Sequence, residues 1–210
     1  CVRLAIMTHR LAAWSSPTMF ASPLLSAQSA CRASSKRDPP AADFNAANGP
    51  GVRISLFVSG CRHHCKDCFN PETWDFSYGE PFDEAVMDKI LAMLAPAYIR
   101  GIPYLGGEPF EPENQPGLLA LSRRIKAAYP EKSIWSFTGY LFDRDILTRK
   151  LGPWEVTQEL LSYLDVLVDG PFIASLKNLN LRFRGSSNQR LIDMPASLKT
   201  GAVVLWDERQ

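Results

Sequence analysis

Apolar residues follow two different spacings in the first part of the regular sequence. Residues 48–51, NGPG, are followed by residues 52–58, VRISLFV, a run of β-branched and apolar side chains. Such a run after a glycine- and proline-containing turn is typical of a buried strand. Residues 82–94 instead place apolar side chains at helical spacing, with acidic residues in the first turn and Pro96 after the end. This second pattern predicts a helix.

The alternation of apolar runs with helical periodicity continues to residue 169. The further elements that it predicts are strand 102–105, helix 116–129, strand 133–138, one or two helical pieces within 141–164, and strand 165–169. Strands that alternate with helices are typical of parallel βαβ units in an α/β fold. We therefore expect a mostly parallel sheet, either open or as a partial (βα) barrel. After Pro171 the pattern predicts a loop at 184–189 and short strands at 190–193 and 202–206.

Glycine-rich or polar segments follow four of the expected strands. They are a cysteine loop from residue 59, Gly106-Gly107-Glu108, Thr138-Gly139 and Asp169-Gly170. Ligand sites in such sheets lie at the carboxyl ends of the strands. We therefore expect the four segments to form one rim, with the cysteine loop as part of it.

The cysteine loop has the spacing CxxxCxxC, with Cys61, Cys65 and Cys68 within eight positions. Thiolates are soft ligands that suit an iron–sulfur cluster or zinc. A [4Fe-4S] cluster needs four iron ligands, so three thiolates leave one iron open to a ligand from outside the protein. The alternative is a zinc knuckle in which His63 or His64 is the fourth ligand. A disulfide framework is disfavoured, because three cysteines cannot pair off.

Composition and charge limit the classes of protein to which the chain can belong. The chain has 210 residues, 46% of them hydrophobic, which is enough for one well-packed domain. Its formal net charge of +1 gives no electrostatic reason to expect binding to nucleic acid or to an anionic membrane. No apolar run approaches the roughly 18 residues that span a bilayer. Cysteines that serve as metal ligands need a reducing compartment, so we expect a cytoplasmic protein.

Residues 1–42 differ in composition from the rest of the chain. They are rich in Ser, Ala and Pro, carry five basic residues before the first acidic one, Asp38, and include Cys1 and Cys31. An acid-free, arginine-containing segment is typical of an organellar transit peptide, and the alternative is a non-native upstream extension. For either origin we predict disorder over residues 1–42 and a single domain over residues 43–210.

Seven short segments resemble the radical S-adenosylmethionine (SAM) enzymes, and among them the activating proteins of anaerobic ribonucleoside-triphosphate reductases, which are glycyl-radical enzymes. The segments are residues 48–53, the cysteine loop with Phe69-Asn70, Thr73-Trp74, residues 106–109, 135–140, 166–170 and 184–189. In most radical SAM enzymes an aromatic residue precedes the third cysteine, where this chain has Asp67. In the activating branch the aromatic residue follows that cysteine, as Phe69 does here. The resemblance covers about residues 43–206.

The resemblance implies roles for residues of the cysteine loop. Cys61, Cys65 and Cys68 would hold a [4Fe-4S] cluster whose open iron binds SAM. Asp67 and Phe69 would lie beside these cofactors, with Phe69 shielding the cluster or lying along the adenine.

The resemblance also implies roles for the other rim segments. Gly106 to Glu108 would meet the amino group of SAM, although GGEP by itself is equally an ordinary strand-to-turn sequence. Asp169, with Thr138 as a weaker partner, would hold a monovalent cation against the SAM carboxylate. The alternative for Asp169 is a turn aspartate that caps Gly170.

The activity implied is reductive cleavage of SAM and formation of a glycyl radical on the large subunit of an anaerobic ribonucleoside-triphosphate reductase. Reduced flavodoxin or a similar protein would be the electron donor. The chain is short and has no second cysteine-rich motif for further clusters, which favours an activase that acts on a protein. The alternatives are another short radical SAM enzyme, similar to 7-carboxy-7-deazaguanine synthase, and a zinc-knuckle binding module without catalysis.

Overall fold

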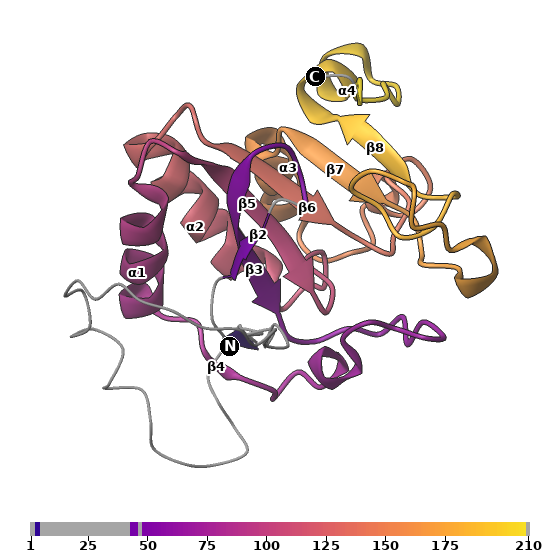
Figure 1. Cartoon of the computed structure of the whole chain (residues 1–210), viewed down its shortest axis with the longest axis horizontal. Helices are drawn as coiled ribbons and strands as arrows, with labels where there is room; N and C mark the ends of the chain where they lie inside the picture. The colour runs from indigo at the N-terminus through magenta and orange to yellow at the C-terminus, as the bar shows by residue number, and fades with distance from the viewer. Residues whose placement is uncertain (1–2, 5–42, 46–47, 209–210) are drawn as a thin grey trace, which may run out of the picture.

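Eight strands form one sheet in the computed structural model, which describes residues 3–4, 43–45 and 48–208. The strands are β1 (Arg3–Leu4), β2 (Asp43–Asn45), β3 (Val52–Val58), β4 (Glu80–Pro81), β5 (Ile99–Gly106), β6 (Ser133–Phe137), β7 (Val166–Asp169) and β8 (Arg190–Asp193). Their order is β4-β1-β3-β5-β6-β7-β8, and β2 pairs with β3 off this path (Figure 1). Strands β3, β5, β6 and β7 are parallel to one another.

Three helices connect the parallel strands: α1 (Glu84–Leu94), α2 (Gln115–Ala128) and α3 (Trp154–Tyr163). Asp83 begins α1, because its carboxylate accepts a hydrogen bond from the amide of Val86 at 2.9 Å. Short 3₁₀ helices lie at η1 (Pro71–Trp74), η2 (Ile146–Thr148) and η3 (Ala174–Leu176). The predicted alternation of strands and helices and the mostly parallel α/β sheet are therefore confirmed.

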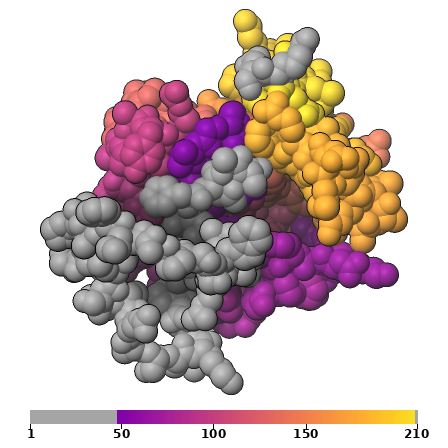
Figure 2. Space-filling model, viewed as in Figure 1, coloured from indigo at the N-terminus to yellow at the C-terminus, as the bar shows by residue number. Residues whose placement is uncertain are grey.

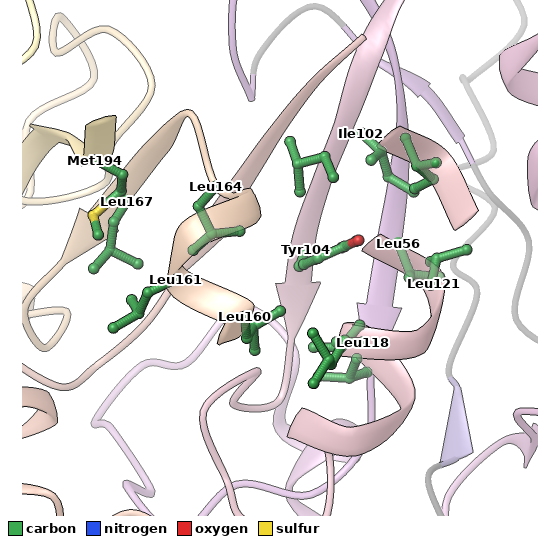
Figure 3. Close-up of a cluster of buried hydrophobic side chains, with 14 of the residues drawn as sticks. Leu56, Ile102, Tyr104, Leu118, Leu121, Leu160, Leu161, Leu164, Leu167 and Met194 are labelled. Carbon is green, nitrogen blue, oxygen red and sulfur yellow. The ribbon is translucent and has the colours of Figure 1, made fainter. Parts of the chain in front are cut away.

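The main hydrophobic core lies between the helices and one face of the sheet. Leu56, Ile102 and Tyr104 point from the strands toward Leu118 and Leu121 of α2, and all five side chains are buried (Figure 3). The hydroxyl groups of Tyr104 and Ser122 are 2.8 Å apart, so the buried hydroxyl of Tyr104 has a hydrogen-bond partner. This core fixes the sheet on which the rim is built.

The opposite face of the sheet carries Arg53, whose side chain is buried. Arg53 pairs with Gly101 across β3 and β5, and Gly101 pairs with Ser133 across β5 and β6. The guanidinium group therefore passes over the glycine and donates to the hydroxyl and the carbonyl of Ser133. It also lies 5.0 Å from the ring centre of Trp135. Burial lowers the pKa of Arg53 to about 10. This arginine joins β3 to β6 across β5, at the amino ends of the strands.

The chain after β7 differs from the prediction in two respects. Residues 202–206 do not form a strand, and Leu205 makes only an isolated bridge with Ile192. Residues 194–200 form a helix, α4 (Met194–Thr200), that the hydrophobic pattern did not predict. Asp193 caps it by accepting a hydrogen bond from the amide of Ala196 at 2.9 Å. The predicted strand 190–193 is confirmed as β8, which pairs antiparallel with β7.

The N-terminal segment is described only at Arg3–Leu4. Leu4 pairs with Val58 of β3, and both residues of β1 pair with β4. The rest of residues 1–42, with Cys1 and Cys31, lies outside the described residues, so the disorder predicted there and the boundary at residue 43 stay predictions. In the part of the chain that the structure describes, no helix combines the length and the hydrophobicity needed to cross a bilayer.

Deletion of residues 1–42 tests the predicted boundary. The truncated protein should keep its circular dichroism spectrum and lose no more than about 2–4 °C in melting temperature, the shift that about 1 kcal/mol causes in a domain of this size. The reason is that β1 contributes only three residue pairs to the sheet. A non-cooperative thermal transition would show that the domain begins before residue 43.

Candidate metal centre

Strand β3 leads directly into the cysteine loop. Gly60 has φ +97°, and a side chain at this position would collide with the ring of Phe76. The amide of Gly60 donates to the carbonyl of Thr73 at 2.8 Å, and the amide of Cys61 donates to that of Trp74 at 3.2 Å. The loop is thus closed at its base, where it leaves the sheet.

The three cysteines of the loop are unpaired thiols. Cys61 is buried, whereas Cys65 and Cys68 are half-buried. His64 and Asp67, each immediately before one of these half-buried cysteines, have left-handed backbone with φ 50° and 58°. Left-handed residues other than glycine are uncommon, and here they turn the chain twice within a few positions. The turns let one short loop present all three thiols.

The three thiols are the soft donors that a cluster or zinc requires. In the described part of the chain, the His, Cys, Asp and Glu side chains form no group of three arranged around a single ion. Nε2 of His63 lies 2.9 Å from Glu108, and the ring of His64 stacks on Trp74. Neither contact occupies both ring nitrogens, so the cysteine spacing, and not the histidine contacts, favours a cluster over zinc.

Burial raises the pKa of the Cys61 thiol to about 12. The pKa of Cys65 is also raised, first by burial and then by the charge of Cys68. These thiols are therefore protonated near neutral pH without metal. Because iron binds the thiolate, loading of the loop must release protons.

The Gly106-Gly107 pair lies against the cysteine loop itself. The amide of Gly107 donates to the carbonyl of Val58 at 2.7 Å. A Cβ atom at Gly107 would come within 2.5 Å of the carbonyl oxygen of Gly60 and 2.8 Å of that of Thr73. Glycine is thus required by the close approach of the chain's own backbone, and the contact to SAM that the resemblance implies stays a prediction.

The carboxylate of Glu108 is buried and fully engaged by protein groups. Its Oε1 accepts from the amide of Phe110 at 2.9 Å, and its Oε2 accepts from the amide of Gly139 at 2.8 Å. The same Oε2 is 2.9 Å from Nε2 of His63. Burial lowers the pKa of His63, but the hydrogen bond and the charge of Glu108 outweigh it, so this pKa is raised. The Glu108 side chain therefore supports the loop and has little capacity left for a ligand.

Asp169 is buried with an arginine partner that the sequence did not reveal. Arg190 donates to both of its carboxylate oxygens, from Nε at 2.9 Å and from Nη2 at 2.5 Å, and the amide of Phe142 donates at 2.8 Å. Thr138 lies at the end of β6, where its hydroxyl accepts from the amide of Tyr140 at 3.1 Å. The role of Asp169 and Thr138 in binding a monovalent cation stays a prediction. The guanidinium group of Arg190 already balances the negative charge of Asp169 that such a cation would need.

Asp67 and Phe69 lie on the outer part of the loop. Both are exposed, and the Phe69 side chain is 76% accessible. In this arrangement Phe69 faces solvent, so its predicted contact with cluster or adenine would require the loop or a ligand to cover it. That role also stays a prediction.

The four predicted rim segments do meet. Glu108 links the cysteine loop to Gly139, the amide of Thr138 donates to the carbonyl of Val168 at 2.9 Å, and the amide of Gly170 donates to that of Tyr140 at 3.0 Å. The loop after β7 also lies near the cysteines, since the backbone of Phe172 acts on the pKa of the Cys65 thiol, in the direction that lowers it. The convergence of these strand ends at one edge is therefore confirmed.

Comparison with known proteins agrees with this donor set. Residues 47–192 match the family model described as a 4Fe-4S single cluster domain. The chain is 44% identical over 144 residues to the anaerobic ribonucleoside-triphosphate reductase-activating protein of Salmonella typhi, covering 68% of this chain and 88% of that protein. The protein of the same name from Vibrio cholerae is 43% identical over 149 residues, covering 70% and 90%. That from Enterobacteria phage T4 is 39% identical over 145 residues, covering 69% and 85%.

Single substitutions of the loop cysteines to alanine test the ligand set. Cys61→Ala, Cys65→Ala and Cys68→Ala should each lose the iron, the sulfide and the visible absorbance of anaerobically reconstituted protein, because a cluster with an open iron has no spare thiolate. Cys31→Ala is the matched control and should retain all three signals. A loop variant that kept its iron would refute the assignment.

Replacement of Asp169 by asparagine tests the buried ion pair. Asp169→Asn should lower the free energy of unfolding of the metal-free protein by about 2 kcal/mol, because it replaces the buried charged acceptor of two Arg190 hydrogen bonds with a neutral amide. Asp143→Asn removes the exposed carboxylate that binds the same arginine at 2.8 Å and should cost less than about 1 kcal/mol. Equal losses in urea unfolding for the two variants would contradict this difference.

Proposed function

The chain belongs to the family of anaerobic ribonucleoside-triphosphate reductase-activating proteins, and we propose that it activates such a reductase with a [4Fe-4S] cluster held by Cys61, Cys65 and Cys68. The observation that carries the proposal is the loop of three unpaired thiols at the carboxyl end of β3, inside the matched region. Three thiolates leave one iron of the cluster for SAM.

The chemistry that the cofactors supply is a one-electron cleavage. A cluster held by Cys61, Cys65 and Cys68 would supply one-electron reductive cleavage of bound SAM, the chemistry needed to remove a hydrogen atom from a glycine Cα of the reductase. A reduced flavodoxin or a protein like it would provide the electron. The chain's own residues bind, orient and shield these groups.

The protein groups suited to these tasks lie around the rim. Cys61 is buried, whereas Cys65 and Cys68 are half-buried, and these three thiolates would hold the cluster. Gly106 and Gly107 are half-buried beside the loop, and we assign their backbone to the amino group of SAM. The assignment is supported by their position at the carboxyl end of β5, beside the cysteine loop, where ligand sites of parallel sheets lie.

The surface next to the loop is suited to a protein partner. The cysteine loop and the segment after β7 lie on the same side of the molecule, where Figure 2 shows them in purple-magenta and orange. They expose Phe69, Leu176 and Leu179, of which Leu179 is 88% accessible. Apolar side chains exposed near a reactive site are typical of interaction surfaces. The edge strands β4 and β8 do not pair with each other among the described residues, so the sheet is not closed.

The decisive experiment combines the reconstituted protein with SAM, reduced flavodoxin or dithionite, and the anaerobic reductase of the same organism. It should give 5′-deoxyadenosine and a glycyl-radical doublet in electron paramagnetic resonance. The doublet should be absent when the reductase glycine is replaced by alanine or when Cys65→Ala is used. Turnover of a small molecule without the reductase would instead indicate a synthase-like enzyme, and zinc in place of iron would indicate a binding module.

A further inference from the structure

The segment that follows Gly107 contacts the cysteine loop through three glutamates. Residues 108–113 have the sequence EPFEPE, and each glutamate binds Arg62 or His63, the two residues directly after Cys61. We propose that Glu108 and Glu111 are positioning residues that hold the cysteine loop in cluster-binding geometry before iron arrives. The inference rests on the proposed assignment of the three cysteines as ligands.

Glu111 holds the loop at Arg62. The Glu111 side chain is only 1% accessible, although it belongs to a loop. Its Oε1 accepts from the backbone amide of Arg62 at 3.0 Å, and its Oε2 accepts from the guanidinium group of the same residue. The guanidinium also lies 4.3 Å from the ring centre of Phe76. One buried carboxylate thus fixes both the backbone and the side chain of the residue next to Cys61.

Glu108 holds the loop at the next position. Its Oε2 contacts Nε2 of His63, and the ring of His63 lies 4.3 Å from that of Tyr140. The backbone amide of Glu108 donates to the carbonyl of Gly60 at 2.8 Å, so the same residue contacts the loop on both sides of Cys61. The Asn114 side chain also links the cysteine loop to the Glu108 segment, because it donates to the carbonyls of Ser59 and Glu108 at 3.0 and 2.9 Å.

The energetics favour an ordered loop without metal. A buried carboxylate is costly unless it is hydrogen-bonded or paired, and both of these carboxylates find partners on the cysteine loop. If the loop moved away, Glu108 and Glu111 would each lose donors while remaining inside the protein. A loop that is ordered beforehand loses less conformational entropy when it binds its ligand.

Amide hydrogen exchange of the metal-free protein tests the proposal without any catalytic assay. In Glu111→Ala, exchange of the Arg62 amide should accelerate at least about tenfold, the effect of losing one hydrogen bond to a charged group. In Glu108→Ala, exchange of the Gly139 amide should accelerate similarly. The matched control is Glu113→Ala, because Glu113 binds the same arginine but is 42% accessible; it should change either rate less than about twofold.

A second measurement separates positioning from general stabilisation. The reconstituted Glu111→Ala protein should lose iron to a chelator several-fold faster than Glu113→Ala, while exchange of core amides such as that of Tyr104 stays unchanged. Glu111→Gln, which keeps an acceptor for the Arg62 amide, should restore most of the protection and serves as the test variant if the alanine protein fails to fold. Unchanged exchange at Arg62, or equal acceleration at Arg62 and Tyr104, would refute the positioning role.

These outcomes are distinct from a failure of the proposed function. If the cysteine variants keep their iron, the ligand assignment is wrong even though the exchange effect at Arg62 persists. If the cysteine variants lose iron while Glu111→Ala exchanges like the unmodified protein, the assignment stands and the positioning role is wrong.

Discussion

The parallel pairing of β3 with β5 is the constraint on which the candidate site depends. Val58 pairs with Gly106, so the first residues of the cysteine loop and the Gly107-Glu108 segment leave the sheet side by side. The ladder continues beyond the strands, because the amide of Gly107 donates to Val58 and that of Glu108 donates to Gly60. There is no room for a side chain at Gly107. The contacts of the cysteine loop with Glu108 and Glu111 follow from this alignment.

Charged side chains, more than apolar ones, join the strand ends. Glu108 with His63, Glu111 with Arg62 and Asp169 with Arg190 each link two segments that are distant in sequence. In each pair the carboxylate is buried, so removal of its partner would leave a buried acceptor with fewer donors, which typically costs about 1–3 kcal/mol. The hydrophobic core on the helical face fixes the sheet, and these pairs fix the loops on it. Substitutions in the two regions should therefore affect different properties of the protein.

Local sequence patterns predicted the strands and helices whose formation depends on residues that are close in sequence. The apolar run before Ser59 predicted β3, and the helical spacing before Pro96 predicted α1. The convergence of the rim also followed, because parallel strands end at one edge. The sequence did not predict the side-chain partners of Glu108 and Asp169. His63 is 45 positions from Glu108, and Arg190 is 21 positions from Asp169. Helix α4 was not predicted, because its seven residues are too few to show a helical period of apolar positions; its signal is local, with Asp193 as the cap and Pro195 in the first turn.

The half-buried state of Cys65 and Cys68 affects how sensitive a bound cluster is to oxygen. Oxygen and chelators can reach the outer side of a cluster bound there, so the cofactor is the part of the molecule that is damaged first. The sheet and its core contain none of the three thiols, and the loop base is closed by backbone hydrogen bonds. Loss of the metal should therefore leave a folded chain instead of an unfolded one. Such a protein can be repaired by delivery of a new cluster and does not have to be synthesised again.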